Sequence, residues 1–298
     1  MVKSPRLRYT TGDKGVQRAR RSKERRHVTA SDPIDISYIA GSTRLFAIAG
    51  HPIDQVRSPE MITAEFKRRQ KDAILLPLHI LPEDFDSVLP AVMKIHNLDG
   101  LVFTVPYKAR ACTLAGELGA QARLVGATNA MRRRPDGRWI ADMFDGLGCV
   151  EAFRRRGFSF GKRRVMLIGA GGAGSAIGVA LAHEHPAAIR LHDIDEGRAR
   201  SLADKIRQID ASIAVDIGPP AWEGMDALIN ASPVGMLDDR RVPVAASSLP
   251  PGLVVLDAIT KPEKTGLLAL AEASGCPTLL GRDMMNGQIS RMVDFFGY

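Results

Sequence analysis

The chain has 298 residues, of which 45% are hydrophobic and 25% charged, and its formal net charge is +8. This length allows one large or two ordinary domains, and no apolar run reaches the roughly 18 residues that a membrane span requires. The three cysteines are scattered, which argues against a disulfide framework or a zinc site and suits a reducing compartment. We therefore expect a cytoplasmic protein with no metal and no membrane partner.

The positive charge is concentrated at the start of the chain. Residues 1–40 contain ten Lys/Arg and four Asp/Glu, and so carry six of the eight net charges. They contain few apolar residues in no sustained period, which predicts a disordered extension. We favour a solvated extension; an arm that binds nucleic acid or an anionic surface and an organelle-targeting peptide are the alternatives.

Beyond residue 40, strands alternate with helices, which predicts a mainly parallel sheet in a first domain over 41–145. We expect strands at 43–49, 74–78 and 100–104. We expect helices at 59–70, 82–95 and 109–118. Ser58 should cap the first of these helices, with Pro59 at its first position. Residues 129–131 and 139–142 flank a Pro-Asp-Gly turn and predict a hairpin.

A second alternating series begins at residue 165 and predicts a nucleotide-binding domain with its own sheet, over 146–280. A helix at 146–156 should lead into it. We expect its strands at 165–168, 188–192, 212–215, 227–230 and 253–257. We expect its helices at 174–183, 197–208 and 265–274. The final segment, 281–298, follows the completed sheet and is free to pack back against the first domain.

A glycine-rich turn between the strand at 165–168 and the following helix points to a dinucleotide. Its spacing, G-x-G-x-x-G, allows a tight turn, a close backbone approach to a pyrophosphate, and tight packing of helix against strand. Asp193 ends the next strand, 24 positions after the first glycine, where such folds place an acid that binds ribose. We therefore expect a Rossmann-type domain. The turn consists of Gly169, Ala170, Gly171, Gly172, Ala173 and Gly174.

Short motifs that flank this turn extend over about residues 43–298. In chain order they are Gly50-His51-Pro52-Ile53 with Ser58-Pro59, Thr104-Val105-Pro106-Tyr107-Lys108, Gly126-Ala127-Thr128-Asn129, Asp145-Gly146, Asn230-Ala231-Ser232-Pro233-Val234-Gly235-Met236, and Gly281-Arg282-Asp283-Met284-Met285 with Gln288. Together with the glycine turn, this series resembles the shikimate dehydrogenase family, which includes quinate/shikimate dehydrogenases. The resemblance implies two α/β domains that flank a cleft, with the substrate on the first and the dinucleotide on the second.

The same resemblance implies a catalytic pair, Lys108 and Asp145. Oxidation of a secondary alcohol moves a hydride to nicotinamide and a proton to a base, and a lysine suits this role because its charge state shifts readily when it is desolvated. An ionised Asp145 would orient the amine and contact the reacting hydroxyl. Taken alone, each residue has a simpler interpretation, an exposed lysine after a proline turn and a helix cap.

Two further groups of residues are assigned by the resemblance. The substrate contacts are expected to be Ser58, Thr104, Asn129 and Gln288, whose hydroxyl and amide groups can bind a polyhydroxylated cyclic acid without a buried charge. The dinucleotide contacts are expected to be Gly169, Ala170, Gly171, Gly172, Ala173, Gly174, Asp193, Asn230, Ser232, Gly235, Met236 and Gly281.

Several positions depart from the family pattern. Val56 stands where a serine is usual, and Phe103 where an asparagine is usual. Met143-Phe144 replaces Asn-Thr, and Thr260 replaces a tyrosine. A lost buried hydrogen bond commonly costs about 1–3 kcal/mol, so two or three such losses would weaken shikimate binding roughly a hundredfold. Arg57 can replace the lost carboxylate contact or simply face water.

For the cofactor we expect NAD, with NADP as the alternative. A carboxylate such as that of Asp193 accepts hydrogen bonds from both ribose hydroxyls and repels a 2′-phosphate. Relatives that prefer NADP resemble Asn-Arg-Thr at this point, whereas Ile194 stands here in place of the arginine. Arg198 lies one helical turn later and reads as a solvated residue.

We therefore expect a shikimate dehydrogenase-like oxidoreductase that acts on shikimate, quinate or a related cyclic hydroxy acid with NAD(P). A regulator that binds a dinucleotide without turnover is the alternative. Family resemblance implies aromatic amino acid and chorismate biosynthesis, whereas NAD leans toward oxidation of a carbon source. The sequence is silent on oligomeric state, and a homodimer is one assembly that we consider.

Overall fold

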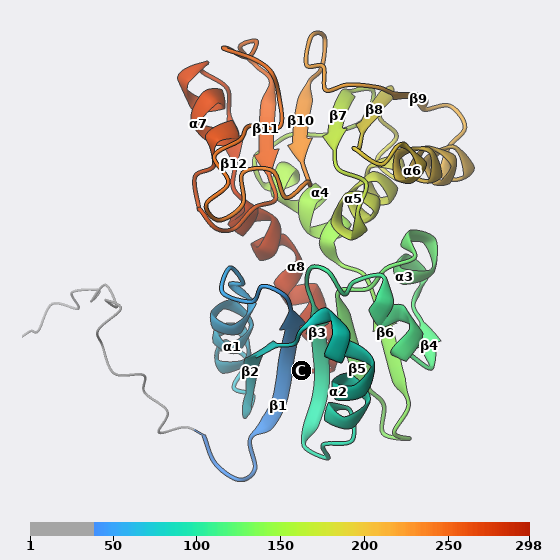
Figure 1. Cartoon of the computed structure of the whole chain (residues 1–298), viewed down its shortest axis with the longest axis vertical. Helices are drawn as coiled ribbons and strands as arrows, with labels where there is room; N and C mark the ends of the chain where they lie inside the picture. Colours follow the sequence, from blue (N-terminus) through green and yellow to red (C-terminus); the bar gives the residue numbers. More distant parts are fainter. Residues whose placement is uncertain (1–38) are drawn as a thin grey trace, which may run out of the picture. The chain divides into compact units, whose positions relative to one another are not determined.

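The computed structural model describes residues 39–298 and contains two six-stranded sheets, each with helices packed against it (Figure 1). The basic extension expected at 1–40 falls outside these residues, apart from its last two. None of the helices in the described part of the chain is long and apolar enough to cross a membrane. The two-sheet architecture confirms the expected α/β fold class.

The first sheet has the strand order β2-β1-β3-β5-β6-β4. Its central strands are parallel, whereas β5 runs antiparallel to both β3 and β6, which confirms the expected hairpin. β4 pairs in parallel with β6 at the edge. The six strands are β1 (Arg44–Gly50), β2 (Ala73–His79), β3 (Leu98–Phe103), β4 (Glu117–Leu118), β5 (Ala130–Arg133) and β6 (Trp139–Asp142).

The helices of the first half differ from expectation in several places. They are α1 (Ser58–Arg68), α2 (Phe85–Val92) and α3 (Ala120–Val125), with 3₁₀ turns η1 (Pro82–Asp84) and η2 (Arg110–Leu114). Ser58 does not cap α1, because Arg57 occupies the N-cap and no side chain accepts a hydrogen bond there. The helix expected at 82–95 forms as η1 followed by α2, and it ends at Val92, three residues earlier than expected.

The expected helix at 109–118 is wrong, and α3 was not expected. Only the 3₁₀ turn η2 forms there, and β4 follows it. The reason is tertiary pairing, because the N–H groups of Gly116 and Gly119 donate to the carbonyls of Trp139 and Ala141 on β6, at 2.9 and 2.7 Å. A strand edge that offers these acceptors overrides a local helical preference.

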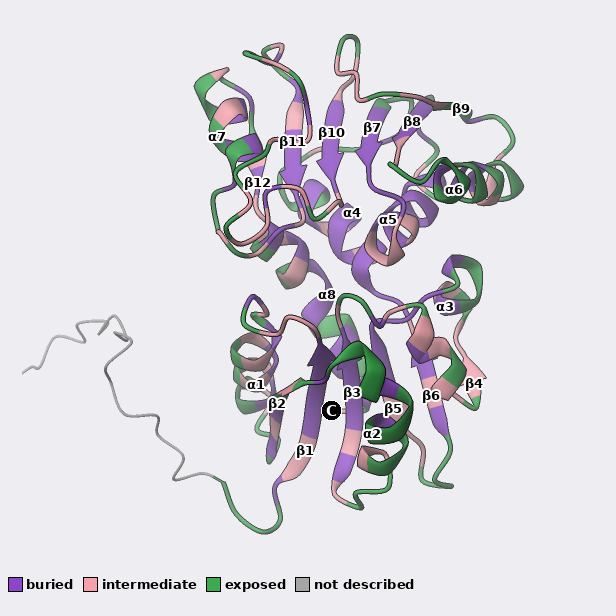
Figure 2. Ribbon diagram, viewed as in Figure 1, coloured by how far each residue is buried: buried purple, intermediate pink, exposed green. Residues whose placement is uncertain are grey.

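The second sheet is entirely parallel, with the order β12-β11-β10-β7-β8-β9. This is the arrangement of a doubly wound dinucleotide-binding fold. Successive strands are added on one side of β7 as far as β9, and then on its other side from β10 to β12. The four central strands of the sheet, β7, β8, β10 and β11, are buried along most of their length (Figure 2), which explains their continuous apolar runs, whereas β9 at one edge has no buried residue. The six strands are β7 (Arg164–Ile168), β8 (Ala188–His192), β9 (Ala214–Ile217), β10 (Ala227–Asn230), β11 (Val254–Asp257) and β12 (Thr278–Leu279).

Four helices belong to this half, and a fifth connects the two halves. The four are α4 (Asp145–Arg155), α5 (Gly172–Ala182), α6 (Glu196–Ile209) and α7 (Gly266–Ala273). The fifth, α8 (Gly281–Phe296), packs along α4 and also against α1 and β5. Glycines allow α4 and α8 to approach closely. A Cβ on Gly148 would lie 2.5 Å from a backbone oxygen of α8, and a Cβ on Gly287 would lie 2.4 Å from a backbone oxygen of α4. At the end of α8, Phe296 contacts the ring of Phe46 on β1, with centroids 4.8 Å apart.

Candidate active site

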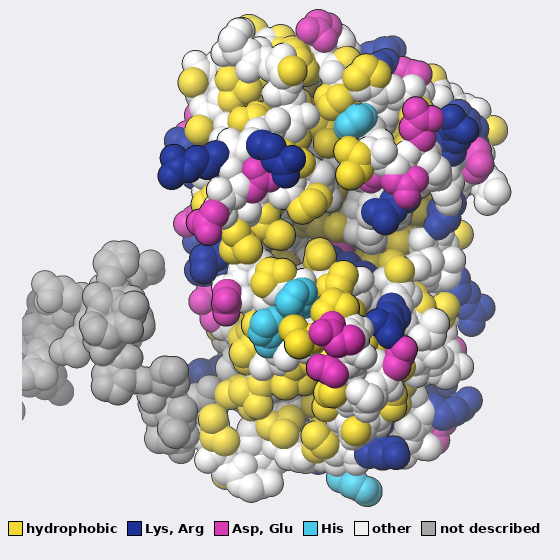
Figure 3. Space-filling view, in the orientation of Figure 1, with side chains coloured by type: hydrophobic (Ala, Val, Ile, Leu, Met, Phe, Trp, Pro, Cys, Tyr) yellow, Lys and Arg dark blue, Asp and Glu magenta, His cyan; other side chains and the backbone are white. Residues whose placement is uncertain are grey.

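A cleft of about 1110 Å³ lies between the two sheets, at the carboxyl ends of their parallel strands. Figure 3 shows residues 39–298 hollowed at mid-height, with many hydrophobic side chains around the hollow. Its lining comes from the ends of β1 and β3, from the start of α8, and from the loops after β7, β8, β10 and β11. In open α/β sheets, ligands bind at this edge of the strands. The cleft is therefore the candidate site.

Lys108 and Asp145 meet in this cleft. Lys108 follows β3, and Asp145 is the first residue of α4. The Lys108 Nζ donates to Asp145 Oδ2 at 2.5 Å, and both side chains are largely buried, with 15% and 6% of their surface exposed. Hydrogen bonds between ionised groups are stronger than neutral ones. The pair therefore holds the amine in one place at the cleft wall.

Two amides hold the carboxylate from its other side. Asn129 Nδ2 donates to Asp145 Oδ1 at 2.9 Å, and Gln288 Nε2 donates to the same oxygen at 3.3 Å. Asn129 Nδ2 also donates to Gln288 Oε1 at 2.8 Å, while Asn129 Oδ1 accepts from the backbone N–H of Phe144. Asn129 and Gln288 line the cleft, but their amide N–H groups are already used: those of Asn129 donate to Asp145 and Gln288, and those of Gln288 donate to Asp145 and the Met285 sulfur.

The two hydroxyls expected to contact substrate are placed differently. Ser58 and Thr104 both line the cleft. Neither hydroxyl has a hydrogen-bond partner among residues 39–298. Ser58 lies at the first turn of α1, where its side chain is not used to cap the helix. Both hydroxyls are therefore available to a bound molecule.

The glycine turn after β7 has the shape that a pyrophosphate requires. Gly169 has φ +95°, and a Cβ there would lie 2.8 Å from the Ala231 carbonyl carbon. A Cβ on Gly174 would lie 1.9 Å from the Gly169 oxygen, whereas one on Gly171 would meet nothing within 4 Å. The turn and the close approach therefore need glycine, and the Gly171 backbone faces open space. These residues fit a bound dinucleotide.

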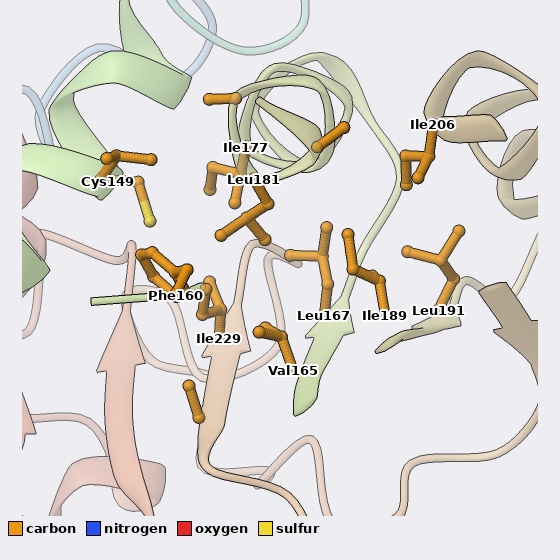
Figure 4. Packing of buried hydrophobic residues seen from close by; sticks show 14 of the residues in the cluster. Cys149, Phe160, Val165, Leu167, Ile177, Leu181, Ile189, Leu191, Ile206 and Ile229 are labelled. Carbon is orange, nitrogen blue, oxygen red and sulfur yellow. The ribbon is translucent and has the colours of Figure 1, made fainter. Parts of the chain in front are cut away.

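The core beneath this turn keeps it in position. Val165 and Leu167 of β7 pack with Ile177 and Leu181 of α5, so the strand and helix on either side of the turn share one cluster (Figure 4). Phe160 and Cys149 extend the cluster toward α4. All three cysteines are free thiols, and burial raises the pKa of Cys149 above its usual range.

The turn also contacts the half of the cleft that contains Lys108. A Cβ on Gly172 would lie 3.1 Å from the Cβ of Lys108 and 3.4 Å from its Cδ. The lysine stem therefore passes directly over the first residue of α5. A glycine here allows the amine and the dinucleotide turn to share one wall.

Asp193 supports the same turn. Its Oδ2 accepts from the Ala170 N–H at 2.7 Å and its Oδ1 from the Asp195 N–H at 2.9 Å. The next residue, Ile194, is 98% exposed. Arg198 pairs with Asp195 at 3.3 Å, so that guanidinium already has an acidic partner.

The loop after β10 is organised by a buried carboxylate. Asn230 Oδ1 accepts from Ser232, and its Nδ2 donates to Asp257 Oδ1 at 3.1 Å. Asp257 also accepts from Thr265 Oγ1 at 2.7 Å. Burial raises the pKa of Asp257 to about 6. Ser232 and Met236 of this loop line the cleft.

Most of the residues expected at the site line the cleft. The exceptions are Gly174, Asn230 and Gly235, which do not line the cleft themselves but belong to the segments that do. Gly174 is covered by the turn itself, and Gly235 has φ +97° in the loop after β10. Gly281 does line the cleft, and a Cβ there would lie 2.3 Å from the Ile259 oxygen.

Two residues that bear on the site gave no signal in the sequence. Lys205 of α6 donates through Nζ to the Val125 carbonyl at the end of α3, at 2.6 Å, and burial lowers its pKa. This bond joins the second half to the segment that leads to Asn129. Gln55, in the loop before α1, is buried at the cleft wall. A lone lysine or glutamine belongs to no recognisable spacing, so only the tertiary fold reveals either role.

The fold and the cleft define a two-sheet α/β protein whose second half has dinucleotide-binding topology. Residues 48–131 match the shikimate dehydrogenase substrate binding domain. The shikimate dehydrogenase (NADP(+)) of Rhodospirillum rubrum is 31% identical over 253 residues, which span 83% of this chain and 89% of that protein. The chain therefore belongs to the shikimate dehydrogenase family.

Solved structures agree with this assignment. Shikimate 5-dehydrogenase from Listeria monocytogenes, in complex with shikimate and NAD, is 26% identical with a TM-score of 0.76, covering 87% of this chain and 93% of that one. Quinate dehydrogenase from Corynebacterium glutamicum, in complex with NAD, is 26% identical with a TM-score of 0.74, covering 85% and 93%.

Proposed function

We propose that this chain is an NAD(P)-dependent dehydrogenase of a secondary alcohol on a cyclic hydroxy acid, with shikimate and quinate as the first substrates to test. The observation that carries the proposal is the position of the Lys108–Asp145 pair. The amine lies 2.5 Å from its carboxylate in the same cleft as the glycine turn, and its stem passes over Gly172. Proton transfer and hydride transfer need their groups at one carbon, and this arrangement supports both.

In the proposed mechanism, Lys108 Nζ accepts the proton of the reacting hydroxyl during oxidation and returns it during reduction. Asp145 orients that amine, and Asn129 and Gln288 fix the carboxylate through its second oxygen. Ser58 and Thr104 donate to or accept from substrate oxygens. NAD(P), held on the glycine turn, would supply the nicotinamide that exchanges the hydride.

A steady-state assay of the purified protein tests this function. Shikimate and quinate are each offered with NAD and with NADP, and the absorbance of the reduced nicotinamide is followed. We expect turnover of at least one acid. Dinucleotide binding without turnover of either acid would overturn the proposal and favour a regulator that has kept the fold.

Within the NAD(P) class we propose that NAD is preferred. Asp193, Asp195 and Glu196 gather where the second strand of the nucleotide fold ends, and the nearby Arg198 is paired with Asp195. A 2′-phosphate would meet this acidic group, and Arg198, the arginine beside the group in residues 39–298, already has a carboxylate partner. The R. rubrum relative is named for NADP(+), whereas the Listeria and Corynebacterium structures contain NAD, so the preference must be measured on this chain.

Replacing Ile194 by Arg is expected to raise kcat/KM for NADP about tenfold or more, with kcat/KM for NAD changed much less. Ile194 is 98% exposed, so the longer side chain meets no steric obstacle. A guanidinium there would add a charge-assisted hydrogen bond to the 2′-phosphate, which contributes about 1.5–3 kcal/mol. Ile194→Gln is the matched uncharged control. A wild-type protein that already prefers NADP would contradict the assignment.

A further inference from the structure

The loop between β1 and α1 contains a buried amide with one unused end. Gln55 is 6% exposed and lines the cleft. Its Nε2 donates to the Pro52 carbonyl at 2.7 Å. Its Oε1 is buried and has no hydrogen-bond partner among residues 39–298. The Gln55 backbone carbonyl accepts from Thr260 Oγ1 at 3.0 Å, which fixes the loop to the second half of the molecule.

An unpartnered buried acceptor is costly and calls for a donor. More than nine in ten buried polar groups in proteins are satisfied, and leaving one unsatisfied costs about 1–3 kcal/mol. The amide cannot simply be turned over, because its N–H group is committed to Pro52. The missing partner is therefore a hydrogen-bond donor from outside residues 39–298, such as a substrate hydroxyl or a water molecule in the cleft that Gln55 lines. Because the oxygen is shielded from solvent in the ligand-free protein, the Gln55 side chain would have to shift toward the cleft to meet that donor.

The neighbouring residues of the loop add a cation and a hydroxyl donor to the acceptor of Gln55. Arg57 also lines the cleft and pairs with Glu60 at 2.9 Å, but both of these side chains are about half exposed. Ser58 presents a hydroxyl without a partner among the described residues. Within four residues, the loop therefore offers a cation and a donor suited to a carboxylate, and an acceptor suited to a hydroxyl.

We propose that Gln55 determines substrate specificity by accepting a hydrogen bond from a hydroxyl on the carbon that bears the substrate's carboxylate. This inference rests on the proposed function. Quinate carries such a hydroxyl, whereas shikimate has a carbon–carbon double bond at that carbon and no hydroxyl there. The substrate class assigned to the site is therefore the saturated cyclic acid with a hydroxyl beside its carboxylate.

Comparison of the two acids in Gln55 variants tests this assignment. In Gln55→Met, which keeps the length of the side chain but removes the acceptor, the ratio of kcat/KM for quinate to kcat/KM for shikimate should fall about tenfold. In Gln55→Glu, which keeps an oxygen in that position, both acids should bind less well but the ratio should stay at or above the wild-type value. Damage to the loop alone would lower kcat/KM for both acids equally and leave the ratio unchanged.

Gln208→Met is the matched control, because Gln208 is an exposed glutamine of α6 that does not line the cleft. It makes the same side-chain change away from the site, so it should leave the ratio unchanged. If Gln55→Met fails to fold in a thermal unfolding assay, Gln55→Asn replaces it, because it withdraws the oxygen by about 1.5 Å, one carbon–carbon bond.

Each outcome decides the matter. Turnover of shikimate alone by the wild-type protein would overturn the inference. An unchanged ratio in Gln55→Met would also overturn it, because the partner of Oε1 would then be water only. Turnover of neither acid would overturn the proposed function, and the inference with it.

Discussion

Replacing Lys108 by Met is expected to lower kcat by about 10²–10⁴-fold, the range typical of a lost general acid–base group. The methionine keeps the stem that passes over Gly172, so the glycine turn should keep its shape and the dinucleotide its affinity. Steady-state kinetics would give kcat, and titration of intrinsic fluorescence would give the dissociation constant of the dinucleotide.

Lys94→Met is the matched control, because Lys94 is an exposed lysine of the same half of the chain and does not line the cleft. It should retain wild-type kcat. A Lys108→Met protein that kept more than about one tenth of the wild-type kcat would remove Lys108 from the proton-transfer role.

Replacing Asp145 by Asn should lower kcat/KM about 100-fold or more. The carboxylate accepts from Lys108, Asn129 and Gln288, so all of its neighbours are donors. An amide in its place must direct an N–H group toward at least one of these donors and also loses the charge that orients the amine. Steady-state kinetics with the best substrate from the assay above would measure the effect.

Asp136→Asn provides the comparison, because Asp136 lies in the exposed turn between β5 and β6. It should leave kcat/KM within about twofold of wild type, as is usual for a surface substitution. Equal losses in the two variants would show that the effect of Asp145→Asn is general destabilisation rather than loss of the orienting carboxylate.

The central strands of the second half could be predicted closely from sequence because they are buried along most of their length. Such strands appear as continuous apolar runs, and the expected strand at 188–192 coincides with β8. The glycine turn could be predicted from the sequence equally well, because the steric reasons for its glycines are local. A Cβ on Gly174 would lie 1.9 Å from the oxygen of Gly169, five residues before it.

The first half was less predictable because its structure depends on distant partners. The segment at 109–118 does not form the expected helix, because the N–H groups of Gly116 and Gly119 donate to carbonyls of β6 and the segment ends as the edge strand β4. Ser58 carries a good capping side chain, but Arg57 takes the cap position and Ser58 lines the cleft. No local pattern contains either result.

The candidate site divides in the same way. Short motifs identified Lys108 and Asp145, whose positions beside each other are consistent with the proposed pair. The commitment of Asn129 and Gln288 to Asp145 could not be predicted, because it joins a loop of the first half to α8, 159 residues further along the chain. The unsatisfied oxygen of Gln55 is likewise a property of the assembled wall.

Transfer of an isotope label tests the central claim most directly. Shikimate or quinate deuterated at the carbon that bears the reacting hydroxyl is incubated with the wild-type protein and oxidised dinucleotide, and the reduced nicotinamide is analysed by mass spectrometry. The account predicts that the deuterium appears in the reduced nicotinamide, and that Lys108→Met forms little of it. Absence of deuterium from the nicotinamide, with the label retained in the acid or lost to water, would contradict the account.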